Sequence, residues 1–220
     1  LASAAKEYMK VYGVLVGKKP IIFTNNDSGY DTAIEFKKNG VDPFVVDIRS
    51  NSNSSVIREA KNLNINIKFA YAISNTKGYK RVNSAIIGKL NKERSDYENF
   101  EIISCDCICV SGNWTPTVHL SSQSGNKLKF DETINAFVPN KSRQNETTVG
   151  SAKGSFTLKK SLEEGFNKGY EMSNKITNKN LKTTVPTSNE KTHDKYDKFY
   201  APRNCIRAWK QSVDKPQFAF

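Results

Sequence analysis

A turn near the N-terminus has residues placed where they could bind a phosphate. Thr24–Gly29 joins a short apolar run to a segment with helical apolar spacing, and free N–H groups at a helix N-terminus attract phosphate. Dinucleotide-binding folds usually have Gly-x-Gly-x-x-Gly here, whereas this turn keeps one glycine and adds the charge of Asp27. Asp47 follows about twenty residues later, where an acid that binds ribose is expected. The turn predicts a Rossmann-like unit. Its nucleotide pocket is either blocked, or it binds a nucleotide through Thr24, Asn25 and Asp47.

A second turn, Gly150-Ser151-Ala152-Lys153-Gly154, precedes a helical pattern in the C-terminal half. Its small residues allow a backbone to approach a ligand closely, and the dipole of the helix that follows favours a phosphate or the polar edge of a cofactor. We therefore take Gly150, Ser151 and Ala152 as candidate cofactor contacts. A plain glycine turn is the alternative.

A third loop follows an apolar run and leads through Trp114 and Pro116 to His119. Open α/β sheets bind ligands at the carboxyl ends of their strands, so Ser111 and Gly112 are further candidate contacts. A lone histidine could act as a general base, but no Ser-His-Asp or Cys-His signature accompanies it. We expect His119 to be a packed or hydrogen-bonded loop residue and His193 to be solvated. The sequence assigns no catalytic residue, and two histidines without clustered acids do not indicate a metal site.

Three of the four cysteines alternate along the chain as Cys105, Cys107 and Cys109. In a β-strand all three would point to one face, with the first and last Cα atoms about 13 Å apart at roughly 3.3 Å per residue. That spacing excludes a shared zinc ion, because Zn–S bonds are about 2.3 Å long, and it places sequential disulfides poorly. We expect small buried hydrophobic residues in a reducing compartment. Cys205 stands alone.

The apolar patterns between residues 1 and 112 predict an α/β fold with a Rossmann-like parallel sheet and flanking helices. Strand and helix alternate, and right-handed crossovers then make the sheet parallel, with Asp47 at the C-terminal end of a strand. The expected helices are 1–17, 28–39 and 55–63, and the expected strands are 21–24, 43–48, 65–73 and 99–110. A turn is expected over 75–78 and a strand pair over 79–90, with a helix as the alternative for 79–90.

The remaining residues are less regular. We expect strands over 127–130, 137–139 and 147–150, then a helix from Gly150 to about Met172. Residues 175–198 are polar without an apolar period, which predicts a poorly packed linker that proteases cut first. Residues 199–220 regain aromatics but are too short to fold alone.

Composition limits the functional classes. The chain has 220 residues, 37% of them hydrophobic, and a net charge of +12 from 34 basic and 22 acidic residues. The lysines are scattered without a run of five or six cations, so a nucleic-acid binder is the least favoured class. No stretch is apolar enough for a transmembrane helix, and residues 1–10 lack the basic start and apolar run expected of a signal peptide. We expect a cytoplasmic protein without a membrane partner, and an internal piece of a longer chain.

Several segments in order resemble the alpha subunit of heterotetrameric sarcosine oxidase. The most specific are Thr-Asn-Asn-Asp-Ser at 24–28 and Ser-Gly-x-Trp-x-Pro-x-Val-His at 111–119. The likeness covers about residues 4–172 and includes Gly17–Ser28, Cys105–Leu120, Gln123–Leu128, Ala136–Pro139 and Gly150–Gly169. Relatives in this group include amine- and opine-oxidising subunits.

This resemblance implies an oxidoreductase fold with two dinucleotide-binding domains, similar to disulfide oxidoreductases, followed by a folate-binding domain. It implies oxidation of a small amine, sarcosine, to glycine, with the one-carbon unit passed to tetrahydrofolate. The alpha subunit would hold NAD, while FAD and FMN serve the beta-subunit side and carry the hydride chemistry. Beta, gamma and delta-type subunits would be the partners of a heterotetramer.

The resemblance also assigns the segments of this chain. Residues 1–17 are a lead-in helix, 18–119 the second nucleotide-fold domain, 120–174 a return segment to the first, NAD-binding domain, and 175–220 a linker with the start of the next domain. Thr24–Ser28 would be in a second nucleotide fold whose glycines are replaced. The turn Gly150–Ala152 would return to the NAD site, which Phe156 and Leu158, just inside the next helix, would line.

Three hypotheses follow. The leading one is a subunit module that contributes part of an NAD-binding fold without being catalytically competent alone. The second is a degenerate Rossmann-like scaffold for subunit assembly, and the third is a subunit of a related opine- or amine-oxidising dehydrogenase. A Gly-x-Gly-x-x-Gly motif after a strand upstream of Leu1 would favour the first.

Overall fold

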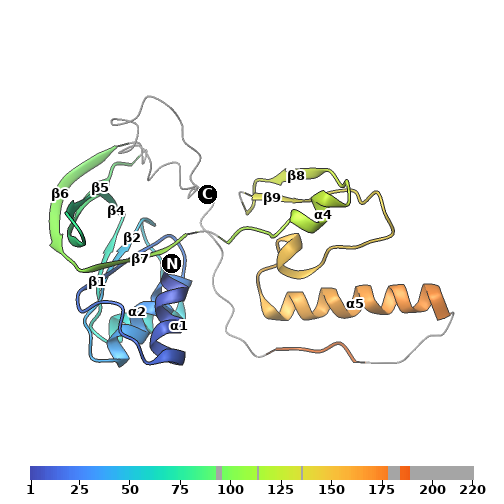
Figure 1. The fold of residues 1–220 in the computed structure, drawn as a ribbon, viewed down its shortest axis with the longest axis horizontal. Helices are drawn as coiled ribbons and strands as arrows, with labels where there is room; N and C mark the ends of the chain where they lie inside the picture. Colours follow the sequence, from blue (N-terminus) through green and yellow to red (C-terminus); the bar gives the residue numbers. More distant parts are fainter. Residues whose placement is uncertain (93–95, 113, 135, 178–183, 189–220) are drawn as a thin grey trace. The chain divides into compact units, whose positions relative to one another are not determined.

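The computed structural model describes residues 1–92, 96–112, 114–134, 136–177 and 184–188. They form two compact units that divide after Asn113 (Figure 1). Unit 1 comprises the described residues up to Gly112, and unit 2 those from Trp114 onward. The assigned domain limits after residues 17, 119 and 174 stay predictions.

A four-stranded parallel sheet forms the centre of unit 1, with the strand order β3-β2-β1-β7. Its strands are β1 (Pro20–Thr24), β2 (Phe44–Asp47), β3 (Asn66–Phe69) and β7 (Cys107–Ser111). Thr24 is in register with Asp47 on one side and Ser111 on the other, so three strand ends meet at one carboxyl edge. The predicted α/β fold is confirmed, as is the position of Asp47 at the end of a strand.

Three helices share a buried core with one face of this sheet (Figure 1). They are α1 (Ala2–Tyr12), α2 (Ser28–Lys38) and α3 (Ser55–Asn62). The inner face of α2 is buried, and its Ala33 and Phe36 pack with Ile22 of β1. Helix α1 ends at Tyr12 because Gly13 adopts a left-handed φ of 62°, so the predicted stop at Gly17 is wrong.

The other face is covered by an antiparallel sheet, β4 (Tyr71–Gly78), β5 (Val82–Leu90) and β6 (Tyr97–Ser104). The sequence analysis mistook these elements. The predicted strand 65–73 breaks at Ala70, which has a φ of 59°, and the predicted turn 75–78 belongs to β4. The predicted pair 79–90 is the single strand β5.

The predicted strand 99–110 also splits, into β6 and β7. Asp106 accepts hydrogen bonds from the backbone N–H groups of Lys18 and Lys19, at 2.7 and 2.8 Å, and so holds the junction outside both strands. Cys105 consequently joins the core under the antiparallel sheet, whereas Cys107 and Cys109 pack on the helical side. The prediction that all three cysteines share one face is wrong for Cys105.

Unit 2 contains α4 (His119–Gln123), the hairpin of β8 (Leu128–Asp131) and β9 (Ala136–Pro139), the 3₁₀ turn η1 (Gly150–Lys153) and α5 (Leu158–Thr177). Strands β8 and β9 confirm two predictions. No strand forms over 147–150, and the helix predicted from Gly150 begins only at Leu158, because Gly154 has a left-handed φ of 103°.

The predicted linker over 175–198 overlaps the end of α5 at Thr177, and otherwise only 184–188 of it is described. The segment 199–220, His193 and Cys205 lie outside the described residues. No helix in the described part of the chain combines the length and apolar character that a bilayer crossing needs.

Candidate nucleotide sites

The turn at the carboxyl edge of unit 1 is closed by its own side chains. Thr24, Asn26 and Gly29 occupy the three glycine positions of Gly-x-Gly-x-x-Gly. The Asn26 amide donates from Nδ2 to the Gly112 carbonyl at 2.6 Å, and its Oδ1 accepts the backbone N–H of Ser28 at 3.0 Å. Ser28 begins α2, so this amide oxygen takes a helix N–H of the kind that a bound phosphate uses.

Other predicted contacts belong to the same network. The hydroxyl oxygens of Ser28 and Ser111 lie 2.9 Å apart, and Ser111 also donates to Asn26 Oδ1 at 3.3 Å. Thr24 Oγ1 donates to the Asn26 carbonyl at 2.8 Å, and Asn25 Oδ1 accepts from Asn26 Nδ2 at 2.9 Å. The structure thus brings Thr24, Asn25, Ser111 and Gly112 together. Their role in binding a cofactor stays a prediction.

The fifth predicted residue of this edge, Asp47, belongs to a buried ion cluster. Arg49 Nη2 donates to Asp47 Oδ2 at 2.8 Å, and Nη1 donates to Asp27 Oδ1 at 2.8 Å. Tyr30 donates its hydroxyl to Asp47 Oδ2 at 2.6 Å. All four residues are at most 3% exposed. Asp27 stands at the N-cap of α2, but its carboxylate pairs with Arg49 instead of capping the helix.

Burial and the neighbouring Asp47 raise the pKa of Tyr30, so this hydroxyl remains a donor. Burial alone would lower the pKa of Arg49, but hydrogen bonds to Asp47 and Asp27 outweigh burial and raise it above its ordinary value. The cluster therefore holds a permanent guanidinium between two carboxylates. Sequence reasoning missed Arg49, and its only signal was a basic residue two positions after the acid that ends β2.

The second turn, in unit 2, is held by a side chain from the helix that follows it. Glu164 of α5 accepts the backbone N–H of Gly150 at 3.0 Å and the hydroxyl of Ser155 at 2.7 Å. Burial opposes ionisation, but these bonds hold the pKa of Glu164 below its ordinary value. Gly150 has a left-handed φ of 66°, which favours glycine. Ser151 is exposed and Ala152 half-buried, so small side chains face solvent on a fixed backbone.

Two predicted contacts follow this turn. Leu158 begins α5 and is exposed, whereas Phe156 precedes the helix, so its predicted place inside the helix is wrong. Its ring lies 6.4 Å from that of Trp114. His119 begins α4 and is exposed, not packed. Among the described residues, no group of three or more His, Cys, Asp or Glu side chains could hold a metal ion.

The chain is 29% identical over 169 residues to sarcosine oxidase subunit alpha from Corynebacterium sp. strains P-1 and U-96, and 28% identical over 172 residues to that from Rhizobium meliloti strain 1021. The chain is similar to sarcosine oxidase alpha subunits. The predicted resemblance is confirmed. The matches cover 75% of this chain and 16–17% of the relatives, so the chain spans a small part of their length.

No protein-family model matches the chain. Among solved structures, thioredoxin reductase from T. acidophilum matches 69% of this chain and 51% of its own, with a TM-score of 0.48 and 14% identity. Bacillithiol disulfide reductase from Staphylococcus aureus matches 63% of this chain and 47% of its own, with a TM-score of 0.46 and 14% identity.

Proposed function

We propose that this chain is a nucleotide-fold segment of a sarcosine oxidase-type oxidoreductase subunit, and that its Gly150–Ser155 turn forms part of an NAD site. The observation that carries the proposal is the similarity to sarcosine oxidase alpha subunits over 75% of the chain. In the full-length protein we expect oxidation of sarcosine or a related amine, with the one-carbon unit passed to tetrahydrofolate. FAD and FMN would act on the side of the beta subunit, within a complex of beta, gamma and delta-type subunits.

The residues of the second turn fit one edge of a dinucleotide. Glu164 fixes the backbone at Gly150, and Ser151 and Ala152 have no bulk that would keep a ligand away. Leu158 supplies exposed apolar surface beside this turn. This chain's residues would only bind and orient NAD, while the flavins would carry the hydride chemistry. Most phosphate contacts in such folds come from another strand–turn–helix, so we expect weak binding by this chain alone.

The closed edge of unit 1 supports a scaffold role for that unit. Asn26 occupies the helix N-terminus, and Arg49 neutralises the carboxylates behind it. We therefore assign NAD to the second turn and structural support to the first.

Calorimetric titration of NAD into the full-length subunit tests this assignment. Ser151→Trp should fill the space beside the turn and weaken NAD binding by about tenfold or more, since a displaced contact of about 1.4 kcal/mol has that effect. Ser151→Ala, the matched control, should bind NAD like the parent. Thr24→Trp should impair folding more than affinity, because Thr24 is buried in the closed edge. If Ser151→Trp binds NAD normally and Thr24→Trp does not, the cofactor binds at the first turn, and the assignment to the second turn is wrong.

A further inference from the structure

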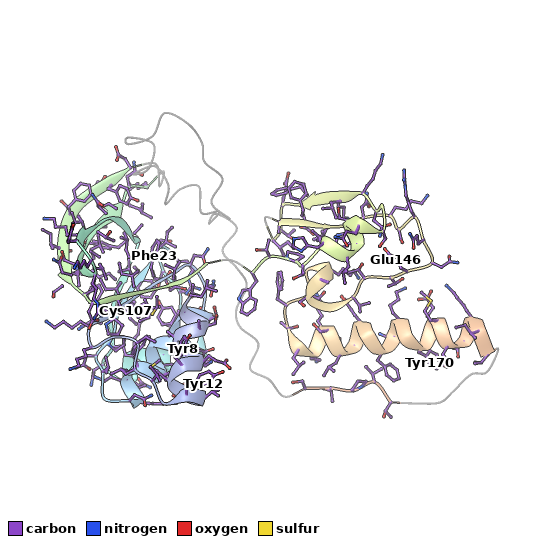
Figure 2. The ribbon with its side chains drawn as sticks, viewed as in Figure 1. Tyr8, Tyr12, Phe23, Cys107, Glu146 and Tyr170 are labelled. Carbon is purple, nitrogen blue, oxygen red and sulfur yellow. The ribbon has the colours of Figure 1, made fainter. Side chains whose placement is uncertain are left out.

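Two cysteine thiols of unit 1 lie together at a place that the proposed function does not use. Cys107, which is labelled in Figure 2, and Cys109 are both on β7, two residues apart. Both pack in the core on the helical side of the sheet, as alternation along a strand requires. Their sulfur atoms are 3.7 Å apart. Cys105, the third cysteine of this run, packs in the core on the opposite face of the sheet.

The two thiols differ in access. Cys109 is 3% exposed and packs in the helical core, whereas Cys107 is half-buried nearer the start of the strand. Gly17 lies against Cys107, because a Cβ at that glycine would come within 2.6 Å of the Cys107 Cβ. The segment next to Cys107 thus has no side chain at the point of closest approach. Cys107 is thus the partly exposed thiol of the pair, and Cys109 is the buried one.

The same contact activates the outer thiol. The hydrogen bond between the two thiols lowers the pKa of Cys107, and the same bond, together with burial, raises the pKa of Cys109. Cys107 therefore ionises more readily than Cys109, and the thiolate is the reactive form of cysteine.

We propose that Cys107 and Cys109 are a reversible redox site that a hydroperoxide oxidises to an intrastrand disulfide. The Cys107 thiolate attacks one peroxide oxygen and breaks the O–O bond, which yields a sulfenic acid at Cys107 and, with a proton, water. The Cys109 thiol then attacks the Cys107 sulfur, forms the S–S bond and displaces the hydroxyl as a second water. Two thiols and one hydrogen peroxide thus give one disulfide and two waters.

Strand geometry makes this disulfide easy to reduce. At roughly 3.3 Å per residue, the Cα atoms of Cys107 and Cys109 are about 6.6 Å apart. Disulfides span about 4.4–6.8 Å between Cα atoms, so the bond would form near the upper limit. As expected for sequential cysteines in a strand, it would close only with backbone strain. Strained disulfides are the labile ones, which suits a switch better than a structural link.

The test uses the whole chain in a Cys205→Ser background, which leaves Cys105, Cys107 and Cys109. After reduction and exposure to hydrogen peroxide, this protein should lose two of these three thiols and two hydrogens of mass, and dithiothreitol should restore both. Cys105→Ser, the matched control, should form the same disulfide. An unchanged thiol count, or loss of the disulfide in Cys105→Ser, would overturn the proposal.

Single variants separate the two roles. Cys109→Ser should stop at the sulfenic acid, so that dimedone labels it about tenfold more than Cys107→Ser, in which the activated thiol is missing. Equal labelling of the two variants would assign peroxide reactivity to another residue and overturn the proposal. Far-ultraviolet circular dichroism verifies that each variant is folded. If one is not, Cys109→Thr, which keeps a hydroxyl donor, replaces Cys109→Ser, and Cys107→Ala replaces Cys107→Ser.

Discussion

The turns at Thr24–Gly29 and Gly150–Ser155 have similar local structure, but side chains from different places order them. Each precedes a helix and contains small or polar residues. In the first turn, Asn26 fills the space at the start of α2 with its own amide. In the second turn, Glu164 reaches back from the second helical turn of α5 and leaves Ser151 exposed. The origin of the ordering side chain therefore decides whether such a turn keeps room for a ligand.

The two turns also differ in how they handle charge. Unit 1 buries two carboxylates behind its turn and balances them with Arg49, whose side chain is 4% exposed. Unit 2 uses one carboxylate, Glu164, with a side chain that is 21% exposed and a lysine 3.7 Å away. Buried ion clusters hold one geometry firmly, whereas partly exposed ones tolerate adjustment. We infer that the first turn is a rigid support and the second an adaptable binding edge.

Removing the guanidinium should have the largest effect on this comparison. Arg49→Met leaves Asp27 and Asp47 buried without a counter-charge, and such uncompensated pairs cost about 3–5 kcal/mol. Urea unfolding with hydrogen exchange on peptides from β1 and β2 measures the loss in unit 1. Lys68→Met breaks the solvated Lys68–Glu101 pair, at 2.6 Å, and should change stability far less. Equal losses in both variants would mean that the cluster is not a rigid support.

Glycine replacement should give the next largest effect. A Cβ at Gly29 would lie 2.5 Å from the Thr24 hydroxyl oxygen, inside the closed turn. Gly29→Ala should therefore destabilise unit 1 by about 1–3 kcal/mol through overpacking. In α5, a Cβ at Gly165 meets nothing within 4 Å, so Gly165→Ala should stabilise the helix by about 0.5–1 kcal/mol. Thermal unfolding of both variants checks the opposite signs, and a neutral Gly29→Ala would show that helix and strand can separate there.

The parts of the fold that the sequence predicts correctly depend on local signals. Strands β1 and β2 are short apolar runs, and α3 begins after Ser54, whose hydroxyl accepts the Ile57 N–H at 3.4 Å. The break between β3 and β4 has no such signal, since Ala70 adopts a left-handed φ only with its N–H bonded to the distant Arg49 carbonyl. A single long strand and two strands with this bend have the same apolar pattern.

The candidate sites follow the same division. Thr24 was predicted from its turn before a helix, and Ser111 with Gly112 from the rule that open α/β sheets bind ligands at the carboxyl ends of their strands. Arg49 and Glu164 were missed because each acts on residues that only folding brings near, as with Arg49 and Asp27, 22 positions apart. Asn26 could have been found by aligning the turn with the three glycine positions, since its bulk stands where the backbone must approach a pyrophosphate.

Loosening the second turn should have a smaller effect than either change in unit 1. Glu164→Ala removes two hydrogen bonds to a carboxylate, and because this group is partly exposed we expect a loss of about 1–2 kcal/mol in unit 2. NAD binding by the full-length subunit should weaken with it, because Gly150 loses its fixed position. Glu164→Gln keeps an acceptor for Gly150 and should recover most of the affinity. Parent-like binding by Glu164→Ala in calorimetry would show that the turn needs no support.

The smallest expected change is the most direct test of what closes the first turn. Asn26→Gly removes the side chain that bonds Gly112 and Ser28, whose backbone groups then turn to water, so we expect a loss of only about 1 kcal/mol. The same change restores a glycine where a Rossmann backbone meets pyrophosphate and frees the Ser28 N–H at the start of α2. Inorganic pyrophosphate should then raise the unfolding midpoint of Asn26→Gly but not that of the parent. Asn26→Asp, which keeps the bulk and adds a negative charge, is the control and should not respond. If pyrophosphate stabilises neither Asn26→Gly nor the parent, Asn26 is not what closes the edge, and the closure must be assigned to the Arg49 cluster behind it.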